Sequence, residues 1–373
     1  MLKFDDNGKF RILQLADIQE TVVTNPDTVN FIRAAIEYTK PDLIVLTGDQ
    51  IKGYGIYMKF GDIRKNFIKA LDNILSPIRD SGVPFCAVFG NHDEVKSATK
   101  QWQWEIYKSY GALGEDIPNI HGTGNFYLNI ASHTSDDTVF RIYCFDSCTR
   151  VEPNLYPYVT ENQLDAYKKV RDEYFEAYDK YCPALAFQHI PVREVYDILR
   201  LTDKKHGYKG ASDFNNGYYT LGEVDAGGFM GENAAVPSVN SGEFEVLSEK
   251  GDVLGLFFGH DHNNSFVGEL NGMKLGYTQG CGFHCYGPGL DRGVRYFDLD
   301  EKDLSKFTTG TVTYREVLGT KLKRPVIEHM YTHSPSSVST AIPFFGKRLA
   351  LAAGVSIAVT GISHIKKAYE KNN

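Results

Sequence analysis

The sequence predicts an α/β fold built from two β-sheets that face each other. Its first half alternates short apolar strands with helical patterns, which is typical of a parallel sheet covered by helices on both sides. From residue 253 onward the pattern changes to short strands separated by Gly and Asn turns, which indicates a largely mixed or antiparallel second sheet. Polar residues able to bind metals follow several of the apolar strands, so we expect a functional site at the strand ends.

The elements of the first half follow from apolar runs and helical spacing. Pro26 occupies the first turn of a helix, where proline is favourable, and Val29, Ile32 and Ile36 recur at helical spacing. We expect strands at 10–16, 42–47 and 84–89, and helices at 26–40, 59–80 and 97–110.

The elements that follow are less regular. We expect strands at 125–130, 138–145 and 184–188, a helix at 161–180, and short strands at 253–258, 264–270, 273–278 and 293–299. Residues 201–238 are rich in Gly, Asn, Asp and Tyr and show little periodicity. Such a long insertion is either a functional lid or a surface excursion without a role, and both interpretations stay open.

Composition narrows the class of protein. Hydrophobic residues make up 42% and charged residues 23% of the 373 residues, as in ordinary globular proteins. The net charge of -7 and the absence of a Lys and Arg cluster argue against a nucleic-acid groove. The six cysteines form no Cys-x-x-Cys motif, and the first residues run straight into a strand without a secretory signal. We therefore expect reduced thiols in a cytoplasmic protein.

The C-terminal extension, residues 321–373, follows a main domain at 1–320. It contains an apolar run at 349–362, within an expected helix at about 345–368, flanked by Lys347-Arg348 and Lys366-Lys367. At about 1.5 Å per residue this run spans roughly 21 Å, less than the ~30 Å hydrocarbon layer of a membrane. A packed terminal helix is the favoured interpretation, and weak peripheral membrane attachment or self-association are the alternatives.

Five motifs contain the candidate functional residues, and most of them directly follow a predicted strand. Two imidazoles separated by one residue, in Gly-His-Asp-His, are a typical way to grip a metal ion. Because parallel strands end at one edge of their sheet, we expect the motif side chains to meet there. A glycine before a ligand leaves room for the metals and permits unusual dihedral angles. The motifs are Asp17-Ile18-Gln19, Gly48-Asp49, Gly90-Asn91-His92-Asp93, His189 and Gly259-His260-Asp261-His262.

In this order the motifs resemble those of the calcineurin-like metallophosphoesterases, and the surrounding sequence is most similar to the purple-acid-phosphatase-like branch. The resemblance runs from about Phe10 to Asp298. It implies a four-layer α/β/β/α sandwich of two mixed sheets with two divalent metal ions (Mn, Fe, Zn or Mg). It also implies a metal-dependent phosphatase whose phosphorylated substrate, a mono- or diester, is attacked by a metal-bound hydroxide.

The resemblance assigns roles residue by residue. Asp49 would bridge both ions and take part in catalysis. His92 would stabilise the phosphoryl oxygens or protonate the leaving group, and with Asn91 would bind substrate. Asp93 and Asp261 would orient neighbouring imidazoles, although each of them taken alone is more typical of a turn aspartate. The first metal would be held by Asp17, Gln19, Asp49 and His262, and the second by Asp49, Asn91, His189 and His260.

Two departures from the family pattern matter. Gln19 stands where the family has His, and a neutral amide oxygen is a weaker and harder ligand than imidazole, which favours Mn²⁺ or Mg²⁺ over Zn²⁺. The alternative is therefore a non-catalytic scaffold that binds metal or phosphate and has a weakened first site. Lys52 replaces the tyrosine of true purple acid phosphatases, so we expect no purple colour. His284 and Tyr286 either bind substrate or shape a turn.

Overall fold

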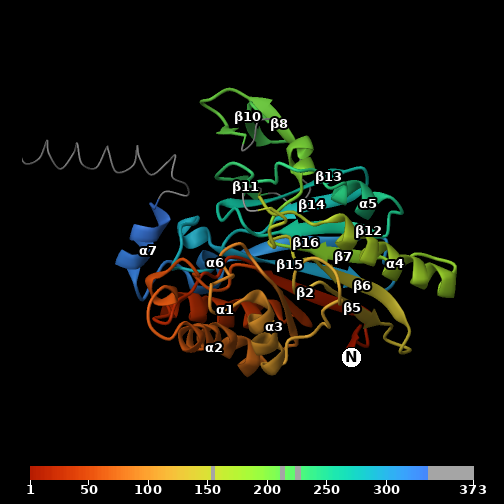
Figure 1. Ribbon diagram of the computed structural model, residues 1–373, viewed down its shortest axis with the longest axis horizontal. Coiled ribbons are helices and arrows are strands. Elements are labelled where there is room, and N and C mark those ends of the chain that lie inside the picture. The colour runs from red at the N-terminus through yellow and green to blue at the C-terminus, as the bar shows by residue number, and fades with distance from the viewer. Residues whose placement is uncertain (153–155, 211–214, 223–227, 335–373) are drawn as a thin grey trace, which may run out of the picture.

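The computed structural model describes residues 1–152, 156–210, 215–222 and 228–334 (Figure 1). Within them, two β-sheets pack face to face between two outer layers of helices, so the fold is the four-layer α/β/β/α sandwich that the resemblance implied. The predicted fold class is confirmed.

The first sheet contains the strands that the sequence placed in the first half. β2 (Lys9–Leu15), β3 (Leu43–Thr47) and β4 (Phe85–Val88) run parallel, and β15 (Gly293–Asp300) joins β2 in antiparallel register with β16 (Phe307–Thr313) beside it. Helices α1 (Pro26–Thr39), α2 (Ile63–Ser81) and α3 (Lys100–Ser109) cover its outer face. In spatial order its strands are β16 (Phe307–Thr313), β15 (Gly293–Asp300), β2 (Lys9–Leu15), β3 (Leu43–Thr47) and β4 (Phe85–Val88).

The second sheet is mixed. Helices α4 (Glu161–Tyr178) and α5 (Glu243–Ser248) cover its outer face, where Tyr143 packs edge-on against Tyr167 of α4 with ring centroids 4.9 Å apart. In spatial order its strands are β1 (Leu2–Lys3), β5 (Phe126–Ala131), β6 (Thr138–Cys144), β7 (Ala184–Phe187), β12 (Val253–Phe258), β14 (Met273–Tyr277), β13 (Asn264–Leu270) and β11 (Gly228–Met230).

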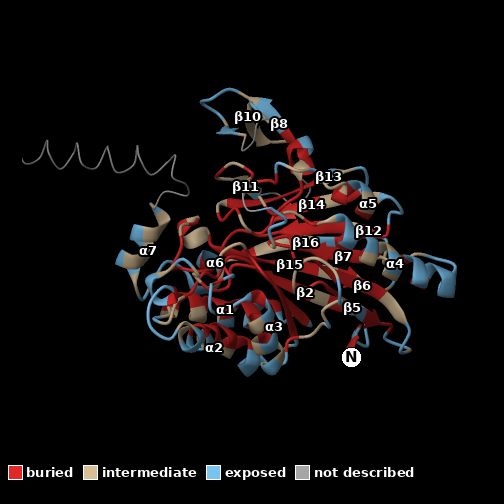
Figure 2. Cartoon of the chain, in the orientation of Figure 1, coloured by how far each residue is buried: buried red, intermediate tan, exposed pale blue. Residues whose placement is uncertain are grey.

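Aromatic side chains fill the space between the two sheets. Phe297 of the first sheet lies 4.5 Å from Phe257 and 5.3 Å from Phe187 of the second, measured between ring centroids. All three are fully buried, as the red interior of Figure 2 shows. Since edge-to-face contacts between buried rings add to the free energy of burial, this cluster holds the sheets, and the strand ends beside them, in one arrangement.

The second sheet is mixed, as the pattern after residue 253 allowed, but its strands do not pair in chain order. β12 is parallel to both β7 and β14, and only β13 pairs antiparallel with β14. β12 is apolar on both faces and almost wholly buried, which suits a central parallel strand. β15 does not continue this sheet. It crosses to the first sheet and covers the free edge of β2.

The insertion at 201–238 contains strands that its sequence pattern did not predict. β8 (Leu199–Thr202), β10 (Tyr218–Leu221) and β9 (Tyr208–Lys209) form a three-stranded sheet that projects from the body at the top of Figure 1, and we call the described residues 199–210 and 215–221 the arm. β11 then joins the edge of the second sheet. Whether the insertion acts as a lid stays untested.

Short helices complete the described chain. They are the single turns η1 (Ile56–Met58) and η3 (Gly289–Asp291), the longer η2 (Arg193–Ile198), and α6 (Tyr314–Leu318) and α7 (Pro325–Thr332) after the last strand. The helix expected at about 345–368 lies outside the described residues. All six cysteines are free and buried.

Candidate metal centre

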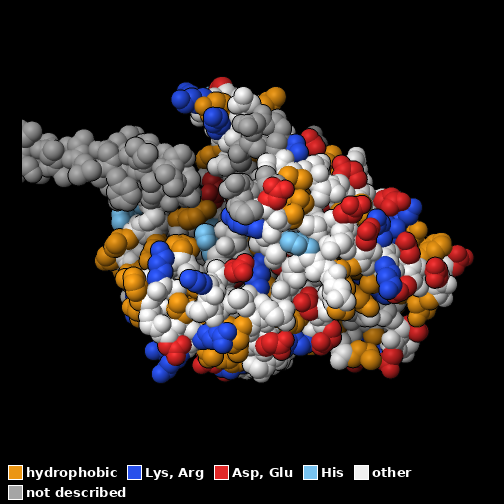
Figure 3. Space-filling model, viewed as in Figure 1, with side chains coloured by type: hydrophobic (Ala, Val, Ile, Leu, Met, Phe, Trp, Pro, Cys, Tyr) orange, Lys and Arg blue, Asp and Glu red, His pale blue; other side chains and the backbone are white. Residues whose placement is uncertain are grey.

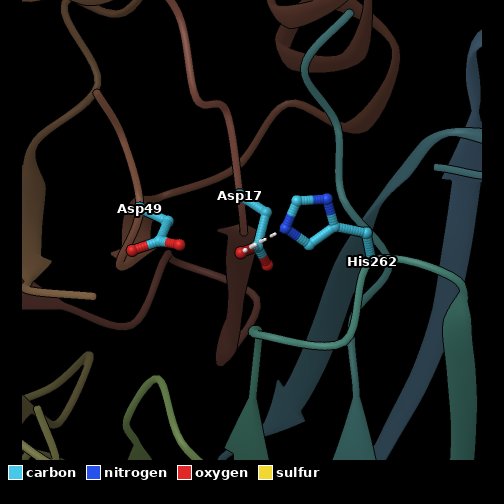
Figure 4. Close-up of side chains that lie close together, drawn as sticks. All are labelled: Asp17, Asp49 and His262. Carbon is cyan, nitrogen blue, oxygen red and sulfur yellow. Dashed lines mark ion pairs between the residues drawn. The ribbon is translucent and has the colours of Figure 1, made fainter. Parts of the chain in front are cut away.

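Three side chains from three different loops converge at the carboxyl edge of the sheets. Asp17 follows β2, Asp49 follows β3, and His262 lies in the loop after β12 (Figure 4). One ligand atom from each lies within 4.8 Å of the other two, and all three residues are buried. The predicted meeting of strand ends thus brings together three of the four residues assigned to the first metal.

The buried carboxylate of Asp17 and imidazole of His262 can share either a proton or a metal ion. Oδ1 of Asp17 is buried and accepts no hydrogen bond. Nδ1 of His262 lies 2.8 Å from the carbonyl oxygen of Tyr286, which can only accept, so Nδ1 carries a proton. In the neutral ring Nε2 therefore keeps its lone pair, and it lies 3.2 Å from Oδ1 of Asp17. A cation between these atoms would satisfy both.

A second convergence surrounds His189. Its Nδ1 lies 2.9 Å from the carbonyl oxygen of Thr47 and donates to it, which leaves the lone pair on Nε2. That nitrogen lies 3.0 Å from Oδ1 of Asn91, 3.2 Å from Nδ1 of His260 and 3.6 Å from Oδ2 of Asp49. The structure therefore groups the four residues assigned to the second metal.

Asp49 stands between the two groups. Its Oδ1 accepts the backbone N–H of His92 at 2.8 Å, while Oδ2 faces His189 and accepts from Nε2 of Gln19 at 2.9 Å. Burial raises the pKa of this carboxyl, but the nearby imidazoles of His189 and His92 outweigh burial and lower the pKa to about 2. Asp49 is therefore ionised at neutral pH, as a bridging ligand must be.

The pKa values of the two histidines in Gly-His-Asp-His shift in opposite directions. Burial and the neighbouring His189 lower the pKa of His260 well below its ordinary value, so its ring is neutral and ready to bind a metal. Burial also lowers the pKa of His262, but the carboxylate of Asp17 outweighs burial and raises it well above the ordinary value. A metal bound at the first group would therefore displace a proton from His262.

Gln19 enters the site with its amide nitrogen rather than its oxygen. Nε2 lies 2.9 Å from Oδ2 of Asp49 and 3.2 Å from Nε2 of His262, while Oε1 accepts from the hydroxyl of Tyr54 at 2.8 Å. The amide nitrogen is a donor and cannot bind a metal. To become a ligand, the amide would have to turn over so that Oε1 replaces Nε2.

The backbone at the site is strained in a consistent way. Left-handed φ angles occur at Asp17 (52°), Gln19 (42°), Asp49 (54°) and His260 (75°), a conformation that costs energy in residues with side chains. These left-handed backbone conformations direct the four side chains toward the candidate metal centre. Among the three motif glycines only Gly48 has a positive φ, of 92°.

Close approach explains the other two motif glycines. A Cβ atom on Gly90 would lie 2.0 Å from Oδ1 of Asp49, and one on Gly259 would lie 2.8 Å from Oδ2 of Asp17. A side chain at either position would push a carboxylate out of the site. The space argument made from sequence holds at all three glycines, since a Cβ on Gly48 would lie 2.6 Å from Nδ1 of His189.

The two aspartates expected to orient imidazoles instead bind backbone. Asp93 accepts the N–H groups of Asp49 and Gly90, each at 2.7 Å, and of Ile51 at 3.2 Å. Asp261 accepts the N–H of Ala235 at 3.0 Å. Both carboxylates fix the loops that carry the ligands, because loop N–H groups near the sheet edge have few other acceptors.

The predicted substrate-contacting residues differ in exposure. The side chain of His92 is 39% exposed, and its ring packs edge-on against Tyr54 with centroids 4.6 Å apart. His284 is buried, with Nδ1 2.7 Å from Oε2 of Glu20. Tyr286 stacks on His262 with ring centroids 4.1 Å apart, and its hydroxyl donates to Glu232 at 3.1 Å. His92 is thus the accessible one, and substrate contact by the other two stays a prediction.

Three residues at the site were not identified from the sequence. The hydroxyl of Tyr156 is hydrogen-bonded to Nε2 of His260, Tyr54 binds Gln19, and Glu232 accepts the backbone N–H of Asn263 at 2.8 Å. Tyr54 could have been found, because it follows Asp49 in the same loop. Tyr156 and Glu232 carry no local signal, because long-range folding alone brings them to the centre.

Several known proteins are similar to this chain. The chain is 30% identical to the "Probable inactive purple acid phosphatase 29" of Arabidopsis thaliana over 82% of this chain and 81% of that protein. It is 27% identical to the "Phosphatase DCR2" of Saccharomyces cerevisiae over 77% of this chain and 49% of that protein. A dimetal phosphatase structure from Danio rerio aligns over 82% of this chain and 99% of that one, at 14% identity and a TM-score of 0.47.

The family assignment rests on a broader match. Residues 10–264 match the model of the calcineurin-like phosphoesterases, and this stretch contains every motif from Asp17 to His262. Members of this family bind a dinuclear metal site, and the acceptor groups around Asp49 fit one. The chain belongs to the calcineurin-like phosphoesterase family.

Proposed function

We propose that this protein hydrolyses a phosphate mono- or diester with two divalent metal ions. The observation that carries the proposal is the convergence of carboxylate oxygens, imidazole nitrogens and the Asn91 amide oxygen into two groups on either side of Asp49. Asp17, Gln19, Asp49 and His262 would hold one ion, and Asp49, Asn91, His189 and His260 the other.

The metals would supply activation of water near neutral pH and neutralisation of phosphate charge. The positive charge of two divalent ions exceeds the negative charge of the two ligand carboxylates, Asp17 and Asp49, so the centre would attract a phosphate ester. His92 is exposed at its edge, and we assign it to the phosphoryl oxygens or the leaving group. Oδ1 of Asp49 accepts the backbone N–H of His92, so the position of the His92 imidazole depends on the carboxylate proposed to bridge the ions.

A second candidate is a scaffold that binds metal or phosphate without catalysis. One observation favours it: Gln19 places an N–H donor where the first metal would lie, so the site can be satisfied without an ion. Several relatives are also named probable inactive phosphatases. Against it stands the convergence of Asp17, Asp49 and His262, whose ligand atoms all lie within 4.8 Å of one another.

The test is hydrolysis of p-nitrophenyl phosphate and bis-p-nitrophenyl phosphate by metal-stripped protein, with Mn²⁺, Zn²⁺, Fe²⁺, Ni²⁺ and Mg²⁺ added back singly. We expect turnover that requires metal and is lost in His92→Ala, and the ratio of the two substrates separates monoesterase from diesterase. Metal-dependent turnover that His92→Ala leaves unchanged would overturn the role of His92. Silence with every metal, together with an empty first site by elemental analysis, would favour the scaffold.

A further inference from the structure

Tyr54 lies between the solvent and the candidate metal centre. The residue is 42% exposed, and its ring contacts the ring of His92 edge-on. Its hydroxyl donates to Oε1 of Gln19 at 2.8 Å. Histidine side chains reach the surface on the face shown in Figure 3, and the side chain of His92 is 39% exposed. Tyr54 therefore joins an accessible part of the site to a proposed ligand of the first metal.

The loop that carries Tyr54 packs directly on the backbone of His92. A Cβ atom on Gly53, the residue before Tyr54, would lie 1.9 Å from the carbonyl oxygen of His92. In addition, Nζ of Lys52 lies 5.1 Å from the ring centroid of Tyr54 and donates to the carbonyl oxygen of His284 at 2.6 Å. These contacts hold the ring of Tyr54 in place, so the ring would lose little conformational entropy on binding a ligand.

The two side chains that Tyr54 contacts approach the same oxygen of Asp49. Nε2 of His92 lies 3.9 Å from Oδ2 of Asp49, and Nε2 of Gln19 lies 2.9 Å from that oxygen. The ring of Tyr54 contacts the first of these side chains, and its hydroxyl contacts the second. Because Asp49 is the proposed bridge between the two ions, a phosphate ester bound at the centre would lie beside the phenol of Tyr54.

The hydroxyl of Tyr54 can act either as a donor or as an acceptor toward Gln19. A phenol offers one proton and two lone pairs. In the structure the proton goes to Oε1 of Gln19, while Nε2 of Gln19 faces Asp49. Gln19 becomes a metal ligand only after its amide has turned, and Nε2 then faces Tyr54 in place of Oε1. The phenol oxygen would accept from Nε2, and its own proton would be free for another acceptor.

We propose that the hydroxyl of Tyr54 donates a hydrogen bond to a phosphoryl oxygen of the substrate once the amide of Gln19 has turned. This inference rests on the proposed function. Tyr54 is then a second substrate-contacting residue beside His92, and its phenol supplies a neutral donor that keeps its proton near neutral pH. Since the orientation of the Gln19 amide decides whether this donor is available, occupancy of the first metal site is linked to binding of the phosphoryl group.

The test is calorimetric titration of inorganic phosphate into Mn²⁺-loaded protein. In Tyr54→Phe we expect phosphate to bind about 10- to 100-fold more weakly, the range for a lost hydrogen bond to a charged group. First-site affinity for Mn²⁺ should stay close to the wild-type value, because the phenol is hydrogen-bonded to Gln19 both before and after the amide turns. Tyr57→Phe is the matched control, since Tyr57 lies in the same loop and is also 42% exposed, and it should bind phosphate like the wild type.

Three results would overturn the contact between Tyr54 and phosphate. They are wild-type phosphate affinity in Tyr54→Phe, an equal loss of affinity in Tyr57→Phe, and a fall in first-site Mn²⁺ affinity that accounts for the weaker phosphate binding. The last result would make Tyr54 a residue that only positions Gln19.

Phosphate binding needs no turnover, so the contact and the proposed function can fail separately. A wild-type protein that binds phosphate through Tyr54 but hydrolyses neither nitrophenyl ester would overturn the proposed function and support the contact. Mn²⁺-loaded wild-type protein that binds no phosphate would overturn both.

Discussion

The hydroxyl of Tyr54 donates to Oε1 of Gln19 at 2.8 Å and thereby turns the amide nitrogen toward Asp49 and His262. This contact links the one atypical position among the proposed ligands to a residue that also touches His92. It explains in physical terms why the first metal site should be the weaker of the two. The site can be filled by an amide donor, and a metal must displace that donor before it can bind.

Replacing Gln19 by His should strengthen the first site. Imidazole offers a lone pair where the amide now offers a donor, so we expect first-site affinity for Zn²⁺ or Mn²⁺ to rise at least about tenfold, a change as large as second-shell substitutions produce. Titration of metal-stripped protein with a competing chelator measures both sites. Second-site affinity is the internal control, and unchanged affinity at both sites would show that residue 19 is not a ligand.

Tyr286 should act as a support for His262. Its ring stacks on the imidazole, and its carbonyl oxygen fixes the proton on Nδ1. Tyr286→Ala removes the stack, so we expect first-site metal affinity to fall about 10- to 100-fold, whereas Tyr286→Phe keeps the ring and should change it little. If both variants bind metal like the wild type, the stack has no role in positioning His262.

Glu243 should make stability fall as pH rises. Burial raises the pKa of this fully buried carboxyl from 4.5 to about 8, and its Oε1 has no hydrogen-bond partner. A raised folded-state pKa means that the native state binds more protons, so the stabilisation is complete below pH 4.5 and is lost as pH rises through about 8.

Glu243→Gln removes that titration while keeping the shape of the side chain. We expect this variant to be more stable than the wild type at pH 8, by on the order of a few kcal/mol, with a flatter pH dependence. Denaturant unfolding of metal-stripped protein at several pH values measures both effects. A variant with the wild-type pH dependence would show that Glu243 is not the group responsible.

The buried ion pair of Lys100 and Asp146 should be important for folding. Their charged atoms lie 2.8 Å apart, and the two side chains are 4% and 0% exposed. Lys100→Met would leave a buried carboxylate without its partner, and we expect a loss of about 3–5 kcal/mol in the free energy of unfolding. Lys168→Met, which breaks the exposed pair with Asp165, is the control and should cost less than about 1 kcal/mol. Equal losses in the two variants would contradict this account.

The sequence allowed the site to be located because its ligands follow strands with strong apolar patterns. Asp17 and Asp49 follow β2 and β3, which are parallel neighbours, so their meeting was predictable. The path of β15 was not predictable, since an apolar strand can cover the edge of either sheet. Nor was the orientation of Gln19, because the hydroxyl of Tyr54 decides which amide atom faces the site, and spacing does not reveal that contact.

The residues that support the site from distant parts of the chain could not be predicted either, because no local sequence pattern reveals their contacts. Glu232 reaches the centre because β11 pairs with β13 beside the loop of His262, and no local pattern encodes that pairing. Tyr156 reaches His260 from a distant loop. The left-handed backbone at Asp17 and Asp49 follows from the whole site being held in place, since residues with side chains rarely adopt it alone.

The most direct test of the dinuclear centre is a crystal structure of the protein grown with Mn²⁺, with anomalous scattering used to locate the ions. We expect two peaks about 3.5–4 Å apart. Asp49 should contact both, with Asp17 and His262 at one peak and Asn91, His189 and His260 at the other. A single peak at the second group, with the amide nitrogen of Gln19 still facing Asp49, would contradict the two-metal account, and so would no peak at either group.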